Sequence, residues 1–115
     1  MSVPDEQLES VMAMYNLGLA EEKLESVIFG HIGNNHVHVN ILPNDMDEYK
    51  NGKKLYLAWA RHIVALGGSV SAEHGIGKIK TPFLELMYGQ EGIAQMRALK
   101  SLFDSEMLLN PGNLF

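Results

Sequence analysis

The apolar positions of this chain recur with two different periods. Near the amino terminus the apolar residues lie three or four positions apart, as on one face of an α-helix: Leu8, Val11, Met12 and Tyr15. This spacing predicts a helix that begins at Pro4 and ends at Gly18. In residues 37–42 apolar and polar residues alternate instead, which is the period of a strand, and residues 27–29 form a second short strand. We expect these two strands to pair as a hairpin.

The rest of the chain has mainly helical patterns. Asp45 has the position of a capping-box residue and predicts a helix that ends near Gly67. Pro82 predicts the start of a shorter helix that ends at Gly89, and residues 91–103 predict a last one. Because the two clearest strands form a hairpin, the pattern predicts an α+β fold, with an antiparallel sheet and helices packed on one of its faces.

Length and composition narrow the class of protein. At 115 residues we expect a single domain over residues 1–115, and the abrupt ends of the chain predict a piece of a longer protein. A net charge of −5 argues against binding of nucleic acid, which requires a basic surface. No apolar run reaches the roughly 20 residues of a membrane span. The acidic amino terminus is not a secretory signal. We therefore expect a cytoplasmic protein, with peripheral attachment to the inner face of a membrane as the alternative.

Three of the five histidines lie in the stretch FGHIGNNHVHVN, residues 29–40. If residues 34 and 35 form a two-residue hairpin loop, His31 lies opposite His38, with Cβ atoms roughly 4.5–5.5 Å apart. Period two adds two more polar side chains to that face of the hairpin: His36 and Asn40. Two imidazoles at this separation can bind one metal ion, although histidines that are merely part of the surface or core remain an even alternative.

A metal site needs a third ligand, and the chain has no cysteine to supply it. The segment GGSVSAEHGIGK, residues 67–78, places Glu73 and His74 side by side among four glycines. Glycines at this density indicate a backbone forced through tight turns close to another group. The alternative is a glycine-rich turn with a solvated acid and histidine.

Taken together and in order, FGHIGNNHVHVNILP, GGSVSAEHGIGKIK and LLNPGNLF resemble the carboxy-terminal domain of the FAD-linked oxidases. This group includes the glycolate oxidase flavoprotein subunit, D-lactate dehydrogenase and D-2-hydroxyglutarate dehydrogenase. The resemblance covers residues 3–115 and implies the ferredoxin-like cap domain of vanillyl-alcohol-oxidase-type flavoproteins, here a truncated part of it. FAD would then be bound mainly by an amino-terminal domain that this chain lacks.

The resemblance also implies roles for individual residues. It implies three ligands of a divalent metal, with zinc favoured over manganese or iron: His31, His38 and Glu73. It makes His74 the catalytic histidine, and it places Asn40 near the substrate, with His36 on the same face as a second substrate contact. Asn110 would approach the flavin, although a simple helix-stop turn explains that asparagine equally well. The chain departs from the family where Asn34, Asn35 and His36 replace the usual Asp, Gly and Asn.

The resemblance implies an FAD-dependent 2-hydroxy acid dehydrogenase or oxidase that transfers hydride from the substrate C2 to the flavin. The partners would be its own FAD-binding domain, a small 2-hydroxy acid and an electron acceptor that the sequence does not identify, with self-association as a further expectation. The isolated chain would be inactive. Two alternatives remain open at this point: a stand-alone metal-dependent hydrolase, and a non-catalytic α+β binding or oligomerisation module.

Overall fold

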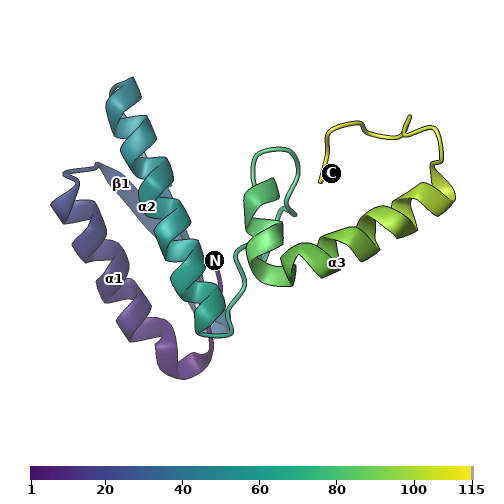
Figure 1. Cartoon of the computed structure of the whole chain (residues 1–115). Helices are drawn as coiled ribbons and strands as arrows, with labels where there is room; N and C mark the ends of the chain where they lie inside the picture. The colour runs from purple at the N-terminus through teal and green to yellow at the C-terminus, as the bar shows by residue number, and fades with distance from the viewer. Residues whose placement is uncertain (115) are drawn as a thin grey trace. The chain divides into compact units, whose positions relative to one another are not determined.

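The computed structural model describes residues 1–114 and has the predicted α+β fold. Its elements follow in the order η1 (Asp5–Gln7), α1 (Leu8–Glu21), β1 (Ser26–His31), η2 (Ile32–Asn34), β2 (His36–Ile41), α2 (Met46–Ala65) and α3 (Thr81–Phe103). The chain divides into two compact units, Met1–Ala72 and a second that starts at Glu73 (Figure 1). The single-domain organisation of residues 1–115 stays a prediction. No helix among residues 1–114 is long and apolar enough to cross a membrane.

The first unit is built on the antiparallel pair of β1 and β2. The amino-terminal residues occupy the other edge of β2: the Met1 amino group donates to the Val37 carbonyl at 2.8 Å, and the Val37 amide donates to the Met1 carbonyl at 3.0 Å. Ser2 in turn exchanges two backbone hydrogen bonds of 2.9 Å with Ser69. The amino terminus therefore ties the end of the first unit to the hairpin.

The core of this unit lies between one face of the hairpin and two helices. In Figure 1, α1 and α2 run side by side in opposite directions, and Tyr15 of α1 meets Trp59 of α2 edge to face at 4.7 Å. The alternation in β2 sends Val37 and Val39 to the buried side, as period two requires. The remaining buried apolar residues of the unit are Met1, Val3, Val11, Leu19, Leu24, Ala60, Ile63 and Val70.

The first helix differs from the prediction at its end. It continues past Gly18 to Glu21, so the expected stop at this glycine was wrong. A Cβ at Gly18 would lie 2.9 Å from Leu55 Cδ1 and 3.3 Å from the Trp59 ring. This glycine therefore serves the close approach of α1 to α2 and not a helix end.

The two later helices follow their sequence signals. The Asp45 carboxylate caps α2 by accepting hydrogen bonds from the amides of Asp47 and Glu48, both at 2.9 Å, as the capping pattern predicts. In the second unit, α3 is interrupted at Gly89, whose φ of 66° and ψ of 177° are not helical. The predicted break between two helical segments at this glycine is confirmed.

Candidate functional site

The hairpin that carries the histidines closes differently from the prediction. Residues 34 and 35 do not form a two-residue loop, because Ile32–Asn34 makes one 3₁₀ turn and Asn35 adopts the left-handed conformation, with φ 48° and ψ 33°. The Asn35 amide donates to the Ile32 carbonyl, and its side chain donates to the carboxylate of Asp5. Asn-Asn is a weak signal for a two-residue turn, and these contacts stabilise a longer loop instead.

The longer loop moves the register by two residues. His31 lies opposite His36, and Phe29 lies opposite His38, so the predicted direct pairing of His31 with His38 was wrong. A shift of two residues leaves every side chain on its original face, whereas a shift of one would reverse them. The predicted grouping on one face therefore survives the change in register: His31, His36, His38 and Asn40.

The three imidazoles form a cluster on this face. The ring centroids of His36 and His38 are 4.5 Å apart, those of His31 and His36 are 6.0 Å apart, and those of His31 and His38 are 6.4 Å apart. Phe29 stacks on the His38 ring with 5.2 Å between centroids and 18° between planes. Two imidazoles that share one zinc ion have centroids about 5 Å apart. The donor set and spacing of His31 and His38 thus suit a metal after a small movement of the rings.

Local backbone structure holds this cluster close together. A Cβ at Gly30 would overlap the carbonyl oxygen of His36 on the neighbouring strand, so a larger residue would push β1 away from β2. His36 is buried, at 6% exposure, whereas His31 is exposed. The cluster therefore has one buried imidazole and one that is exposed to solvent.

A pocket of about 460 Å³ lies near the end of β2. Asn40, the predicted substrate contact, is among its lining residues, and Lys53 supplies a cation above the Tyr49 ring, 5.5 Å from its centroid. Burial raises the pKa of the Tyr56 phenol, which also lines the pocket. The pocket therefore combines apolar walls with hydrogen-bonding and cationic groups.

The predicted acid and histidine of the glycine-rich segment lie together at the start of the second unit. The Glu73 carboxylate is 3.3 Å from His74 Nε2. His74, Gly75 and Gly77 all have left-handed backbone, with φ of 63°, 65° and 59°. Positive φ is uncommon for any residue other than glycine, so the backbone at His74 lies in a sparsely populated conformation. The loop is thus the tight turn that the glycines predict, and it presents an imidazole whose side chain is 74% exposed.

The carboxy-terminal segment meets this loop. Asn110 has a φ of 48°, and its carbonyl accepts a hydrogen bond from the Asn113 amide at 3.2 Å, so the NPG motif forms a turn. The Leu114 amide then donates to the Gly77 carbonyl at 3.3 Å. The segment that carries the predicted flavin contact, Asn110, is therefore connected to the His74 loop within one unit.

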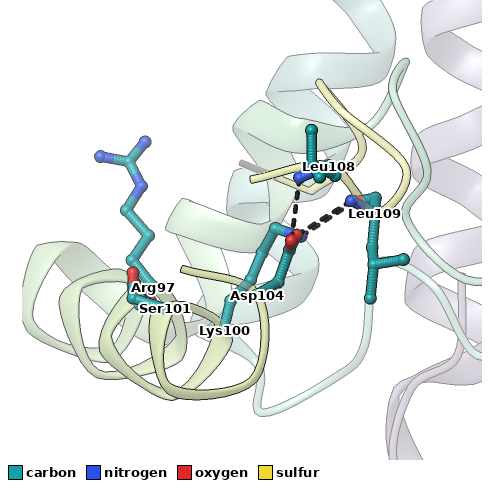
Figure 2. A network of polar contacts seen from close by, with 6 residues as sticks. All are labelled: Arg97, Lys100, Ser101, Asp104, Leu108 and Leu109. Carbon is teal, nitrogen blue, oxygen red and sulfur yellow. Dashed lines mark hydrogen bonds and ion pairs between the residues drawn. The ribbon is translucent and has the colours of Figure 1, made fainter. Parts of the chain in front are cut away.

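A polar cluster at the end of α3 was not predicted from the sequence (Figure 2). Asp104 is 8% exposed, and its two carboxylate oxygens accept the amides of Leu108, at 2.8 Å, and Leu109, at 3.0 Å. Lys100 Nζ donates to the same carboxylate at 2.6 Å and to the Leu109 carbonyl at 2.9 Å. We call these four residues the Asp104 clamp. The only sequence signal for it is a Lys four residues before an Asp at a helix end.

The Asp104 clamp predicts an acid-sensitive turn. The hydrogen bond from Lys100 lowers the pKa of the Asp104 carboxyl, and the amides of Leu108 and Leu109 lower it further. A carboxyl with a lowered folded-state pKa stabilises the fold above its unfolded pKa of about 3.9 and loses that contribution as pH falls through the folded pKa. In urea unfolding, the stability lost in Asp104→Asn should be constant from about pH 7 to 5 and shrink below about pH 4. A loss that is the same at pH 7 and at pH 3 would contradict this role of the charge.

The predicted site residues thus fall into two groups. His31, His36, His38 and Asn40 gather in the first unit, whereas Glu73, His74 and Asn110 belong to the second. The covalent chain limits the distance from Ser69 to Glu73, because Glu73 follows Ser69 by four residues and four extended residues span at most about 14 Å. Ser69 pairs with Ser2, which pairs with His36. That Glu73 joins the two histidines as a ligand stays a prediction.

Comparison with known proteins gives this arrangement a context. Residues 1–114 match the family described as FAD linked oxidases, C-terminal domain. The chain is 31% identical to glycolate oxidase subunit GlcD of Bacillus subtilis, over 99% of the chain and 25% of that protein. It is 39% identical to D-2-hydroxyglutarate dehydrogenase of Stutzerimonas stutzeri, over 79% of the chain and 20% of that protein. It is 37% identical to D-lactate dehydrogenase of Archaeoglobus fulgidus, over 84% of the chain and 21% of that protein. The chain spans a quarter or less of the length of these curated relatives.

Proposed function

The chain belongs to the C-terminal domain family of the FAD linked oxidases, and from this premise we propose that it is the substrate- and metal-binding domain of an FAD-dependent oxidoreductase. The proposed substrates are 2-hydroxy acids, since three of its relatives are named for glycolate, D-lactate and D-2-hydroxyglutarate. The observation that carries the proposal is the cluster of three imidazoles on one face of the hairpin. The family favours this function over a stand-alone hydrolase or a non-catalytic module.

The proposed metal ligands are His31, His38 and Glu73. Two imidazoles and a carboxylate form a donor set that suits zinc with one open coordination position, and manganese or iron accept the same ligands. A divalent cation bound there would supply a positive charge that acidifies a chelated hydroxyl group. The ring separation of 6.4 Å between His31 and His38 supports the imidazole half of this set. The carboxylate half rests on the short chain connection from Ser69 to Glu73.

The other residues have roles in binding and proton transfer. His74 accepts the proton of the substrate hydroxyl, a task for which imidazole is suited near neutral pH. The Glu73 carboxylate lies 3.3 Å from His74 Nε2 and orients the imidazole. Asn40 and His36 donate hydrogen bonds to the substrate carboxylate. A flavin held mainly by a separate FAD-binding domain supplies the hydride acceptor, and Asn110 lies in the turn proposed to face it.

Metal binding by the histidine pair is tested by titration calorimetry with Zn²⁺ and Mn²⁺. We expect near-stoichiometric binding to the wild-type chain and loss of most of the affinity, at least about 100-fold, in His38→Ala, because one of three protein ligands is removed. The matched control is His62→Ala, which removes an exposed histidine of α2 outside the hairpin. Equal affinity in His38→Ala and wild type would exclude His38 as a ligand.

A further inference from the structure

The carboxy-terminal turn is not held by burial of its apolar side chains. Leu108 and Leu109 are 76% and 65% exposed, and Leu102 and Phe103, at the end of α3, are 81% and 83% exposed. Burial of such side chains is the usual way to hold a segment against a helix. In its absence, the Asp104 clamp fastens this segment to α3 through four polar contacts (Figure 2).

The hydrogen bonds of the clamp involve charged groups. Both oxygens of one buried carboxylate are used, each by a different backbone amide, and Lys100 binds the carboxylate and the Leu109 carbonyl at once. Charge-assisted hydrogen bonds of this kind are roughly twice as strong as neutral ones. An exposed contact on the same helix, from Ser101 Oγ to the Arg97 carbonyl at 3.0 Å, has no comparable reach because it stays within one helical turn.

The clamped segment leads directly to the Glu73–His74 loop. Five residues after Leu109 the chain reaches Leu114, whose amide donates to the Gly77 carbonyl. Asn113 lies at the same place, since its Oδ1 would be 3.7 Å from a Cβ at Gly77. Gly77 is the last of three residues with left-handed backbone in this loop, after His74 and Gly75. The exposed loop therefore has a backbone hydrogen bond to a segment that is itself fixed at its other end by the clamp.

We propose that Lys100 and Asp104 are positioning residues that hold the Glu73–His74 loop through the carboxy-terminal segment. The proposal rests on the proposed function only for the catalytic role of His74. The hydrogen bonds that link the clamp to the loop all lie within the second unit. Lys100 and Asp104 touch neither the substrate nor the flavin in this proposal, and they act through Leu114 and Gly77.

Backbone amide exchange and chemical shifts, measured by NMR on the whole chain, test the link. In Asp104→Asn the amides of Leu108 and Leu109 should exchange roughly 10- to 100-fold faster, because a charged acceptor is lost. The Leu114 amide should follow by at least about tenfold, and the resonances of residues 74–77 should shift. The matched control is Glu106→Gln, which removes an exposed carboxylate two residues away and should change none of these signals.

Two milder variants keep the test decisive if Asp104→Asn unfolds the unit. Lys100→Arg retains the charge and should leave exchange at Leu114 close to the wild-type rate, whereas Lys100→Gln removes the charge and should accelerate it. Faster exchange at Leu108 and Leu109 with unchanged signals from Leu114 and residues 74–77 would overturn the inference, because the clamp would then act only locally.

Turnover separates this inference from the proposed function. In the flavoprotein that carries this chain, Asp104→Asn should lower kcat about tenfold with a smaller change in KM, as expected when a reacting group is misplaced. If His74→Ala leaves turnover unchanged, the proposed role of His74 as proton acceptor fails, although the measured link in the loop stands. If His74→Ala abolishes turnover and Asp104→Asn lowers neither kcat nor kcat/KM, the positioning role is wrong and the proposed function stands.

Discussion

Replacing His74, the proposed general base, with alanine should lower the turnover of 2-hydroxy acids by the proposed oxidoreductase about 10²- to 10⁴-fold, the usual contribution of such a group. The reason lies in the local structure. The His74 imidazole projects from a turn with left-handed backbone, is 74% exposed and has the Glu73 carboxylate 3.3 Å away. Anaerobic stopped-flow measurement of flavin reduction with glycolate, D-lactate and D-2-hydroxyglutarate isolates the half-reaction in which the substrate loses its C2 hydride and its hydroxyl proton.

The size of the effect can be separated from simple disturbance of the loop. His74→Gln keeps a polar side chain of similar length that cannot accept a proton, so it should be nearly as slow as His74→Ala. His62→Ala removes an exposed histidine of α2 and should leave the rate of flavin reduction unchanged. Reduction at the wild-type rate in His74→Gln would show that another group takes the hydroxyl proton.

The histidine face shows what a period-two pattern can predict. The alternation in residues 37–42 assigned the correct side chains to each face even though the loop, and with it the register, was wrong. The error was two residues, which preserves the faces. The register itself depended on Asn35, which has left-handed backbone. Its side chain contacts Asp5, thirty residues away in the sequence. A turn signal read from neighbouring residues contains no information about such a contact.

Long-range contacts also account for the other differences. Gly18 looked like a helix end, but its role is set by Leu55 and Trp59 on another helix. The pairing of Met1 with Val37 could not be predicted, because residues 1–3 are too few to show a strand period. Asp104 is an ordinary charged residue by sequence, and only the return of the chain at Leu108 and Leu109 makes it a buried anion with partners.

The candidate site follows the same rule. Adjacent or hairpin-related residues were grouped correctly, namely the three histidines and the Glu73–His74 pair. Whether these two groups share one metal ion depends on long-range structure, which neither periodicity nor local motifs determine. Titration calorimetry with a Glu73→Gln variant therefore tests the third metal ligand.

Replacing Trp59 with alanine should destabilise the first unit by about 3–5 kcal/mol, the usual cost of emptying a buried aromatic site. Trp59 is 3% exposed, meets the Tyr15 ring edge to face at 4.7 Å and fills the space that Gly18 leaves open. Few domains exceed a total stability of about 5–15 kcal/mol, so this loss removes a large fraction of it. Urea unfolding followed by circular dichroism measures it, since Trp59 is the only tryptophan and its fluorescence is lost in the variant.

The same variant tests whether the helical core supports the histidine face. Val37 and Val39 face the core and alternate along β2 with the imidazoles, so a loosened core should loosen the imidazole cluster without removing a ligand. In folded Trp59→Ala we therefore expect metal affinity to fall by less than about tenfold, a far smaller change than in His38→Ala. Leu17→Ala, at a position that is 60% exposed, should change the free energy of unfolding by no more than about 0.5 kcal/mol. A Trp59→Ala chain as stable as Leu17→Ala would mean that the contact between α1 and α2 does not hold the sheet that carries the histidines.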